Sequence, residues 1–198
     1  MRRRLQPDAR RLEIIEAAEK LLKRHGTAVR VEDVVTKAKA AKGTFYTYFA
    51  TWDDLLDFIR ERKIAEIEGA VAPILVFGPA TDWHKVLPSL GVILIDFIVA
   101  LGGLHDVLFH SAFTRNRPMP QHTRPAARLA AVLNAGMAAG AYAKLDPEPT
   151  GVLISALIHE TADTILAGAD RERALSALNH MLHRLVFTES QNDRGRSK

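Results

Sequence analysis

The chain has 198 residues, of which 47% are hydrophobic and 25% are charged, as in an ordinary globular protein. It contains no cysteine, which excludes disulfides and thiolate metal sites and fits a reducing compartment. No apolar run reaches the roughly 18 residues that span a membrane, and the basic start lacks the apolar segment of a secretory signal, so we expect a cytoplasmic protein with no membrane partner.

The charge is unevenly distributed. Residues 1–50 hold 12 Lys and Arg against 6 Asp and Glu, a net charge of +6, whereas residues 51–198 have a net charge of −2. A small basic region is typical of a protein that binds a polyanion at one end, although a solvated surface with a basic tail gives the same count. The preferred interpretation of Arg2, Arg3 and Arg4 is a disordered tail that adds nonspecific phosphate affinity; the alternative is an arm in a minor groove.

Two helices are predicted first along the chain. RRLEIIEAAEKLLKRHG carries one apolar stripe, with Pro7 at its start and Gly26 at its stop. After a short link, VEDVVTKAKA predicts a second, shorter helix with Glu32 and Asp33 in its first turn, where the helix dipole favours acids.

The next stretch, AKGTFYTYFATWDD, consists largely of residues that form helices poorly. Phe45 and Phe49 are four residues apart, so they share one helix face and reach a core together. A weak helix anchored in this way leaves its other faces open to a partner, and these carry Lys42, Thr44, Tyr46 and Tyr48.

Two short helices joined by a tight turn and supported by a third make a helix-turn-helix, whose second helix reads the DNA major groove. Lys42 suits a phosphate or a guanine edge, and Gly43 allows close backbone approach. Thr44 can bond a phosphate and contact a thymine methyl, while Tyr46 and Tyr48 can donate hydroxyls to phosphates.

The remainder is also predicted to be helical. Thr51 is the expected N-cap of a helix over 52–72, with Asp53 and Asp54 in its first turn and an end before Pro73. No strand alternation is visible, and the terminal residues 191–198 are polar and predicted to be disordered. Further helices are predicted over 81–101, 103–114, 121–143, 148–168 and 171–187.

The segments RRLEIIEAAEKLLKRHG, EDVVTKAKAAKGTFYTYF and DDLL resemble the TetR family of one-component transcriptional regulators, over about residues 8–60. The resemblance implies an all-α homodimer of about nine helices, with a DNA-binding domain over 1–50 that contains the helix-turn-helix at about 31–50. A ligand-binding and dimerisation domain over 51–190 would follow. It further implies a repressor that binds a near-palindromic operator and is released by a small-molecule effector. The DNA-binding residues expected on this basis are Arg30, Lys39, Lys42, Gly43, Thr44, Tyr46, Tyr48 and Trp52.

Three residues depart from the family pattern. Lys39 stands where the family usually has Gly, at a cost of about 1 kcal/mol if the turn is left-handed, or with the gain of a phosphate contact. Ala41 replaces a frequent Ser or Thr cap. Trp52 replaces a common phosphate-binding lysine; it can donate its indole N–H or simply pack, and packing is the interpretation we favour.

The last two predicted helices are apolar enough to need a second surface, which favours dimerisation over a thick monomeric core. The expected dimer residues are Leu157, Ile158, Ile165, Leu178, Met181, Leu182 and Leu185. Aromatic and methionine side chains are typical of a pocket for a largely apolar effector, and equally of plain core. The pocket candidates are Trp83, Phe97, Phe109, Phe113, Met119, Met137 and His159.

Catalysis, a metal and a cofactor are not expected. His180 with His183, and His159 with Asp163, have spacings compatible with metal ligation, but HExxH, GxSxG, P-loop and GxGxxG motifs are all missing from the sequence. The other hypotheses are a helical small-molecule binder or scaffold with degenerate DNA binding, and an activator or nucleoid-type DNA binder without an inducer.

Overall fold

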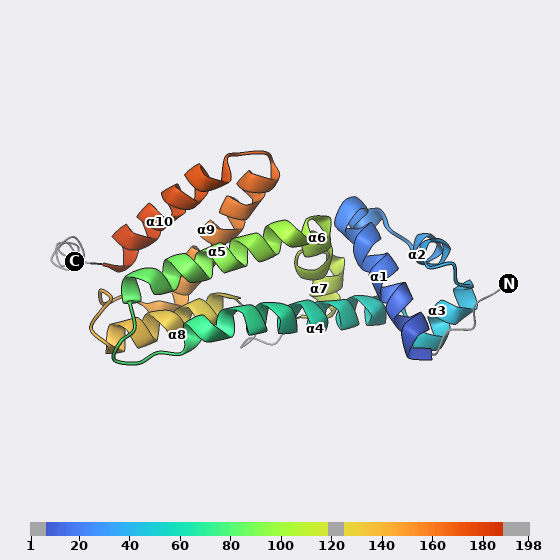
Figure 1. The fold of residues 1–198 in the computed structure, drawn as a ribbon, viewed down its shortest axis with the longest axis horizontal. Coiled ribbons are helices and arrows are strands. Elements are labelled where there is room, and N and C mark those ends of the chain that lie inside the picture. Colours follow the sequence, from blue (N-terminus) through green and yellow to red (C-terminus); the bar gives the residue numbers. More distant parts are fainter. Residues whose placement is uncertain (1–6, 119–124, 188–198) are drawn as a thin grey trace. The chain divides into compact units, whose positions relative to one another are not determined.

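The computed structural model describes residues 7–118 and 125–187, and this part of the chain is helical with no strand (Figure 1). The all-α prediction is therefore confirmed. The described helices pack as two units: unit 1 comprises residues 7–65 and 101–118, and unit 2 comprises residues 66–100 and 125–187. The predictions for Arg2–Arg4, Met119 and residues 191–198 lie outside the described residues.

Unit 1 contains α1 (Pro7–His25), α2 (Val31–Lys37), α3 (Lys42–Tyr48), the first part of α4 (Trp52–Val71), α6 (Gly103–Phe109) and α7 (Ala112–Asn116). The ends of α1 are those predicted, since it begins at Pro7 and Gly26 follows with a positive φ of 53°. Packing units and functional domains are different divisions, so a functional boundary at residue 50 stays a prediction.

The core of unit 1 joins α1 to helices from distant parts of the sequence. Ile14, Ile15 and Phe45 are fully buried in it. A Cβ on Gly103 would lie 3.1 Å from the carbonyl oxygen of Leu22, so the first residue of α6 packs directly on the backbone of α1. Only glycine fits this contact without a shift of the backbone.

The helix is interrupted between α6, which ends at Phe109, and α7, which begins at Ala112, where a single helix over 103–114 was predicted. The Ser111 hydroxyl donates to the Val107 carbonyl at 2.7 Å and accepts from the Phe113 N–H at 3.2 Å. Ser111 thereby ends one helix and caps the next, as serine often does. The prediction of one continuous helix is wrong for this reason.

Unit 2 contains the rest of α4, most of α5 (Trp83–Leu101), α8 (Pro125–Ala138), α9 (Pro147–Leu166) and α10 (Arg171–Val186). As predicted, α4 ends before Pro73, and a short 3-10 helix (Ala72–Leu75) follows. Helix α8 ends earlier than the predicted residue 143, because Gly140 takes a positive φ of 68°. Leu87, Ile95 and Leu133 lie at the centre of the core.

Helix α5 is long and apolar enough to cross a membrane by length and composition alone, with a mean hydropathy of 1.8. The expectation that no segment would reach this threshold is wrong. Burial explains part of this apolarity, since Val86, Leu87, Leu90, Ile95 and Ile98 belong to the core of unit 2. Core helices of water-soluble proteins meet the same criterion, so the hydropathy of α5 carries little weight by itself.

Two glycines let α8 pack closely against its neighbours. A Cβ on Gly151 of α9 would lie 2.6 Å from the Ala126 carbonyl oxygen of α8, so the two backbones touch. The ring of Tyr142 occupies the space that a Cβ on Gly136 would need. The Tyr142 hydroxyl donates to the Trp83 carbonyl at 3.0 Å, and burial raises the pKa of this phenol well above its usual value.

Candidate nucleic-acid interface

Helix α3 is held in place by its aromatic side chains. Phe45 has an exposed fraction of 0%, and its ring centroid lies 5.7 Å from that of Phe49. The Trp52 ring stacks 6.4 Å from Phe45, and Phe58 lies 6.3 Å from Phe49. Tertiary packing thus compensates for the poor helix propensity of this stretch. The stacking of Trp52 agrees with the packing interpretation.

The opposite face of α3 is accessible. Lys42 and Gly43 are exposed, Tyr46 is 48% exposed, and Thr44 and Tyr48 are partly buried. A Cβ on Gly43 would meet nothing within 4 Å, and its φ is not positive, so nothing in the described chain requires glycine there. Any requirement for Gly43 therefore comes from a partner.

The turn between α2 and α3 is strained at Lys39, the one described non-glycine residue with a positive φ, 51°. The turn is therefore left-handed at Lys39, the case for which the sequence analysis gave a cost. Arg10 of α1 supports the turn by donating to the Ala38 carbonyl at 3.2 Å. Ala41 gives α3 no side-chain cap, as expected.

Arg30 supports the backbone before α2. Its guanidinium donates to the Thr27 carbonyl at 2.7 Å and to the Val29 carbonyl at 3.1 Å. Its own N–H donates to the Asp33 carboxylate at 2.8 Å. The side chain is exposed, so these contacts hold a cation at the surface beside α2.

An ion pair joins the first turns of α2 and α3. The Lys42 ammonium donates to Glu32 Oε1 at 2.5 Å. The hydrogen bond from Lys42 lowers the pKa of Glu32, and the hydrogen bond to Glu32 raises the pKa of Lys42. Sequence reasoning placed Glu32 correctly in the first turn of its helix but did not pair it with Lys42.

The start of α4, directly after α3, is held by a second set of charges that the sequence analysis missed. The Asp54 N–H donates to Thr51 Oγ1 at 3.1 Å, which confirms Thr51 as the cap. Arg117, just beyond α7, donates to Asp54 at 2.9 Å and also to Asp57. Arg60, only 8% exposed, donates to the Arg117 carbonyl at 2.6 Å. Hydrogen bonds from Thr51, and then from Arg117, lower the pKa of Asp54.

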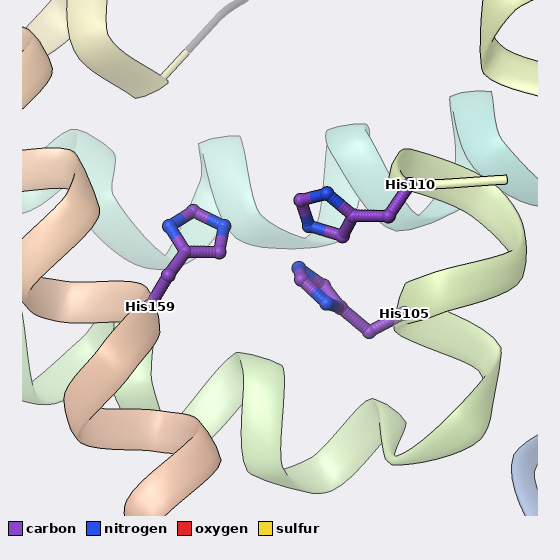
Figure 2. Close-up of side chains that lie close together, drawn as sticks. All are labelled: His105, His110 and His159. Atoms are coloured by element: carbon purple, nitrogen blue, oxygen red, sulfur yellow. The ribbon is translucent and has the colours of Figure 1, made fainter.

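Two pocket candidates lie in unit 1. Phe113 is buried beneath Arg60, whose guanidinium carbon is 4.7 Å from the ring centroid. The Phe109 ring lies 5.3 Å from that of His105. His105 is buried and its ring is 4.9 Å from that of His110; Figure 2 draws both residues together with His159 of unit 2.

Four pocket candidates lie in unit 2, and all are partly buried. Trp83 packs 5.5 Å from the ring of Tyr142, and Met137 Sδ accepts from the Leu145 N–H at 3.3 Å. His159 Nδ1 lies 2.8 Å from the Ser155 carbonyl. A role for these three residues, or for Phe97, in effector binding stays a prediction.

The predicted dimer residues divide into two groups. Ile158, Leu178 and Leu182 are buried inside unit 2, where they fill the core and offer almost no surface to a second copy, contrary to our expectation. Leu157, Ile165 and Leu185 are partly buried, and Met181 is exposed.

Further exposed apolar side chains on α9 were missed as dimer candidates: Val152, Leu153 and Leu166. Helices α9 and α10 pack side by side (Figure 1). Because α9 is apolar on several sides, its sequence does not distinguish core from surface. We define the apolar face as Val152, Leu153, Leu157 and Leu166 of α9 with Met181 and Leu185 of α10.

Comparison with known proteins supports the helix-turn-helix interpretation. Residues 14–58 match the model of the family described as bacterial regulatory proteins, tetR family. A search of curated proteins found no match.

Solved structures with a similar fold include two whose descriptions name TetR. A TetR transcription regulator from Haloarcula marismortui is 18% identical, with a TM-score of 0.68 over 91% of this chain and 100% of that one. A TetR-like transcriptional regulator from Rhodococcus is 18% identical, with a TM-score of 0.68 over 89% and 94%. A gamma-butyrolactone receptor described as ArpA-like is 20% identical, with a TM-score of 0.73 over 96% and 94%.

Proposed function

The first part of this chain, residues 14–58, belongs to the TetR family of bacterial regulatory proteins, and we propose that the whole protein is a homodimeric transcriptional repressor. It binds a near-palindromic DNA operator and leaves it when a small molecule binds unit 2. In this proposal it works in the cytoplasm and catalyses no reaction. The expected partners are double-stranded DNA, a second copy of the chain and a largely apolar effector.

The observation that carries the proposal is the two-sided character of α3. One side is anchored by buried Phe45 and Phe49, and the other presents Lys42, Gly43 and Tyr46 to solvent. A cation, a hydroxyl and an open backbone are the groups that contact phosphates and base edges. A helix that is packed rigidly on one side and polar on the other suits the recognition role in a helix-turn-helix.

The apolar face of α9 and α10 supports the dimer. Its exposed leucine, valine and methionine side chains are poorly solvated by water, and large exposed apolar side chains that gather on one side of a protein are typical of protein interfaces. A second copy of the same face is the simplest cover, because most oligomers are symmetric and use one patch twice. Two copies would also present two α3 helices to a palindromic site.

Selection from a random pool of DNA duplexes at near-physiological salt tests the proposal. The expected result is a two-fold symmetric motif, which requires two recognition helices in one complex. Enrichment without a motif, or no retention of DNA, would contradict the repressor. The same protein can then be titrated with candidate effectors on the recovered duplex. Lactones belong in that screen because one protein of similar fold is named as a gamma-butyrolactone receptor.

Two substitutions test whether α3 is the reading element. Lys42→Ala and Tyr46→Ala are expected to weaken binding to the selected duplex with only a small change in thermal unfolding, because both side chains are exposed. If Lys42 contacts a phosphate, its loss lowers affinity on all sequences and reduces the salt slope by about 1. Unchanged affinity in both variants would rule out this assignment.

A helical small-molecule binder with degenerate DNA binding is the competing function. The strained turn at Lys39 and the uncapped start of α3 favour it, because both weaken the recognition element. Effector binding by a protein that retains no duplex would establish this alternative. An activator is distinguished from a repressor only by the direction of the transcriptional response to the bound protein.

A further inference from the structure

We propose that Glu32 competes with DNA for Lys42: it holds the lysine ammonium in the unbound protein and has to release it when DNA binds. Glu32 would then lower the affinity of the protein for DNA. The inference rests on the proposed function, because it assumes that Lys42 contacts DNA. It concerns a residue of α2 that the helix-turn-helix interpretation leaves without a role.

The geometry brings the two residues together across the turn. They are ten positions apart, in the first turns of α2 and α3, and the ammonium lies 2.5 Å from Glu32 Oε1. Both side chains remain accessible, with exposed fractions of 55% for Lys42 and 62% for Glu32. The pair is therefore formed at the surface, where a phosphate can reach the same ammonium.

The neighbouring acid has a different contact. Asp33 accepts from the Arg30 N–H at 2.8 Å and so stabilises the start of α2. Glu32 and Asp33 are the two acids between residues 30 and 48, and Glu32 is the one whose carboxylate pairs with the charged group of a predicted DNA-binding residue. The charge of Arg30 also acts on Glu32, lowering its pKa to a smaller extent than Lys42 does. The charges of two cations of the proposed interface thus act on one carboxylate, and Lys42 is the one that contacts it.

When DNA binds, Lys42 exchanges the Glu32 carboxylate for a DNA phosphate or base. Glu32 then remains without this ion pair, close to the negatively charged DNA. An exposed ion pair of this kind shifts an equilibrium by about two- to fivefold. In addition, a carboxylate close to phosphates is repelled by them at low ionic strength. Both effects oppose the complex. Glutamine keeps the size of the side chain and removes the negative charge on which both effects depend.

The experiment compares Glu32→Gln with Glu16→Gln, which makes the same charge change at an exposed position of α1. Each variant is made in the wild-type background and with Lys42→Ala. The probes are the duplex recovered by selection, or a mixed-sequence duplex if selection yields no motif. Dissociation constants are measured at low and at near-physiological salt, with thermal unfolding as a check on folding.

We expect Glu32→Gln to tighten binding about two- to fivefold at low salt, and by more than Glu16→Gln does. The gain should shrink as salt is raised. It should also be smaller in the Lys42→Ala background, because only the general repulsion is left to relieve there. That dependence on Lys42 is the result that a simple change in net charge does not produce.

Three results would overturn the inference while leaving the proposed function intact: equal gains for the two glutamine variants, equal gains with and without Lys42, or weaker binding by Glu32→Gln. If the wild-type protein retains neither duplex, the proposed function fails and the inference fails with it. The wild-type measurement therefore separates the two failures.

Discussion

Helices α3 in unit 1 and α9 in unit 2 each bury one side and expose the other, but only the exposed side of α9 carries aliphatic side chains, beside acids such as Glu160. In α3 the solvent side carries Lys42 and Tyr46, whereas in α9 it carries Val152 and Leu153. The buried sides are alike, since Phe45 and Ile154 both have an exposed fraction of 0%. The exposed side, and not the packing, therefore indicates the partner that each helix suits.

This difference also explains why the exposed residues of α3 could be predicted from the sequence and those of α9 only in part. In a helix such as α3, the polar residues are easily distinguished from the apolar residues that anchor it. The side of the helix on which each residue lies can therefore be predicted from its chemistry. In α9, leucine and isoleucine serve equally for core and for interface, and only the three-dimensional structure separates Ile158 from Leu157. An interface made from core-like residues is hidden in the sequence.

The largest effect is expected on the buried side of α3. Phe45→Ala removes a fully buried ring that contacts Phe49 and Trp52, and should destabilise unit 1 by about 3–5 kcal/mol. Its neighbour Tyr46 is the matched control, because Tyr46→Ala should change stability by only about 0.5 kcal/mol. Urea unfolding followed by circular dichroism measures both. Similar losses in the two variants would mean that α3 does not have two distinct sides.

The next largest effect is expected on the exposed side of α9. Leu153, a member of the apolar face, is 60% exposed, and Leu153→Glu should raise the dissociation constant of the dimer at least about 30-fold. Sedimentation equilibrium measures this directly. Ser176→Glu adds the same charge at an exposed polar position of α10, on the side away from Met181 and Leu185, and serves as the control. A Leu153→Glu protein that remains dimeric would place the interface elsewhere.

Gly43→Ala separates the needs of the fold from those of the partner. The structure has room for the methyl group, and alanine favours a helix by up to about 1 kcal/mol. We therefore expect a protein that is equally or slightly more stable but binds the selected duplex more weakly, because the methyl group keeps DNA from the backbone. Parallel thermal unfolding and DNA titration test this. Full DNA affinity in the variant would show that the backbone does not approach DNA closely there.

The smallest effect is expected at the turn. Lys39→Gly should stabilise unit 1 by about 1 kcal/mol, since glycine adopts the positive φ of 51° without strain. If Lys39 also contacts a phosphate, DNA affinity should fall at the same time and the salt slope should decrease by about 1. If Lys39→Gly raises the stability and leaves the DNA affinity unchanged, Lys39 acts in the turn alone. If the substitution lowers the stability, the backbone at Lys39 is not strained.

The sequence predicted the features that depend on local chemistry. The ends of α1 and the Thr51 cap each follow from one residue and its neighbours, and both were found. The missed features depend on residues far apart in the chain. The contact of Arg117 with Asp54 and Asp57 links positions about 60 residues apart, and no periodicity within one helix reveals such a pairing.

The close contact between Gly136 and Tyr142 also has a genetic consequence. Because the tyrosine ring occupies the position of a side chain at residue 136, Gly136→Ala alone should be selected against. A second change that shortens residue 142 should suppress it, although the hydroxyl contact with the Trp83 carbonyl is then lost as well. In a library randomised at both positions, survivors should therefore pair a larger residue 136 with a smaller residue 142. These two positions are expected to evolve together, although neither belongs to a proposed binding surface.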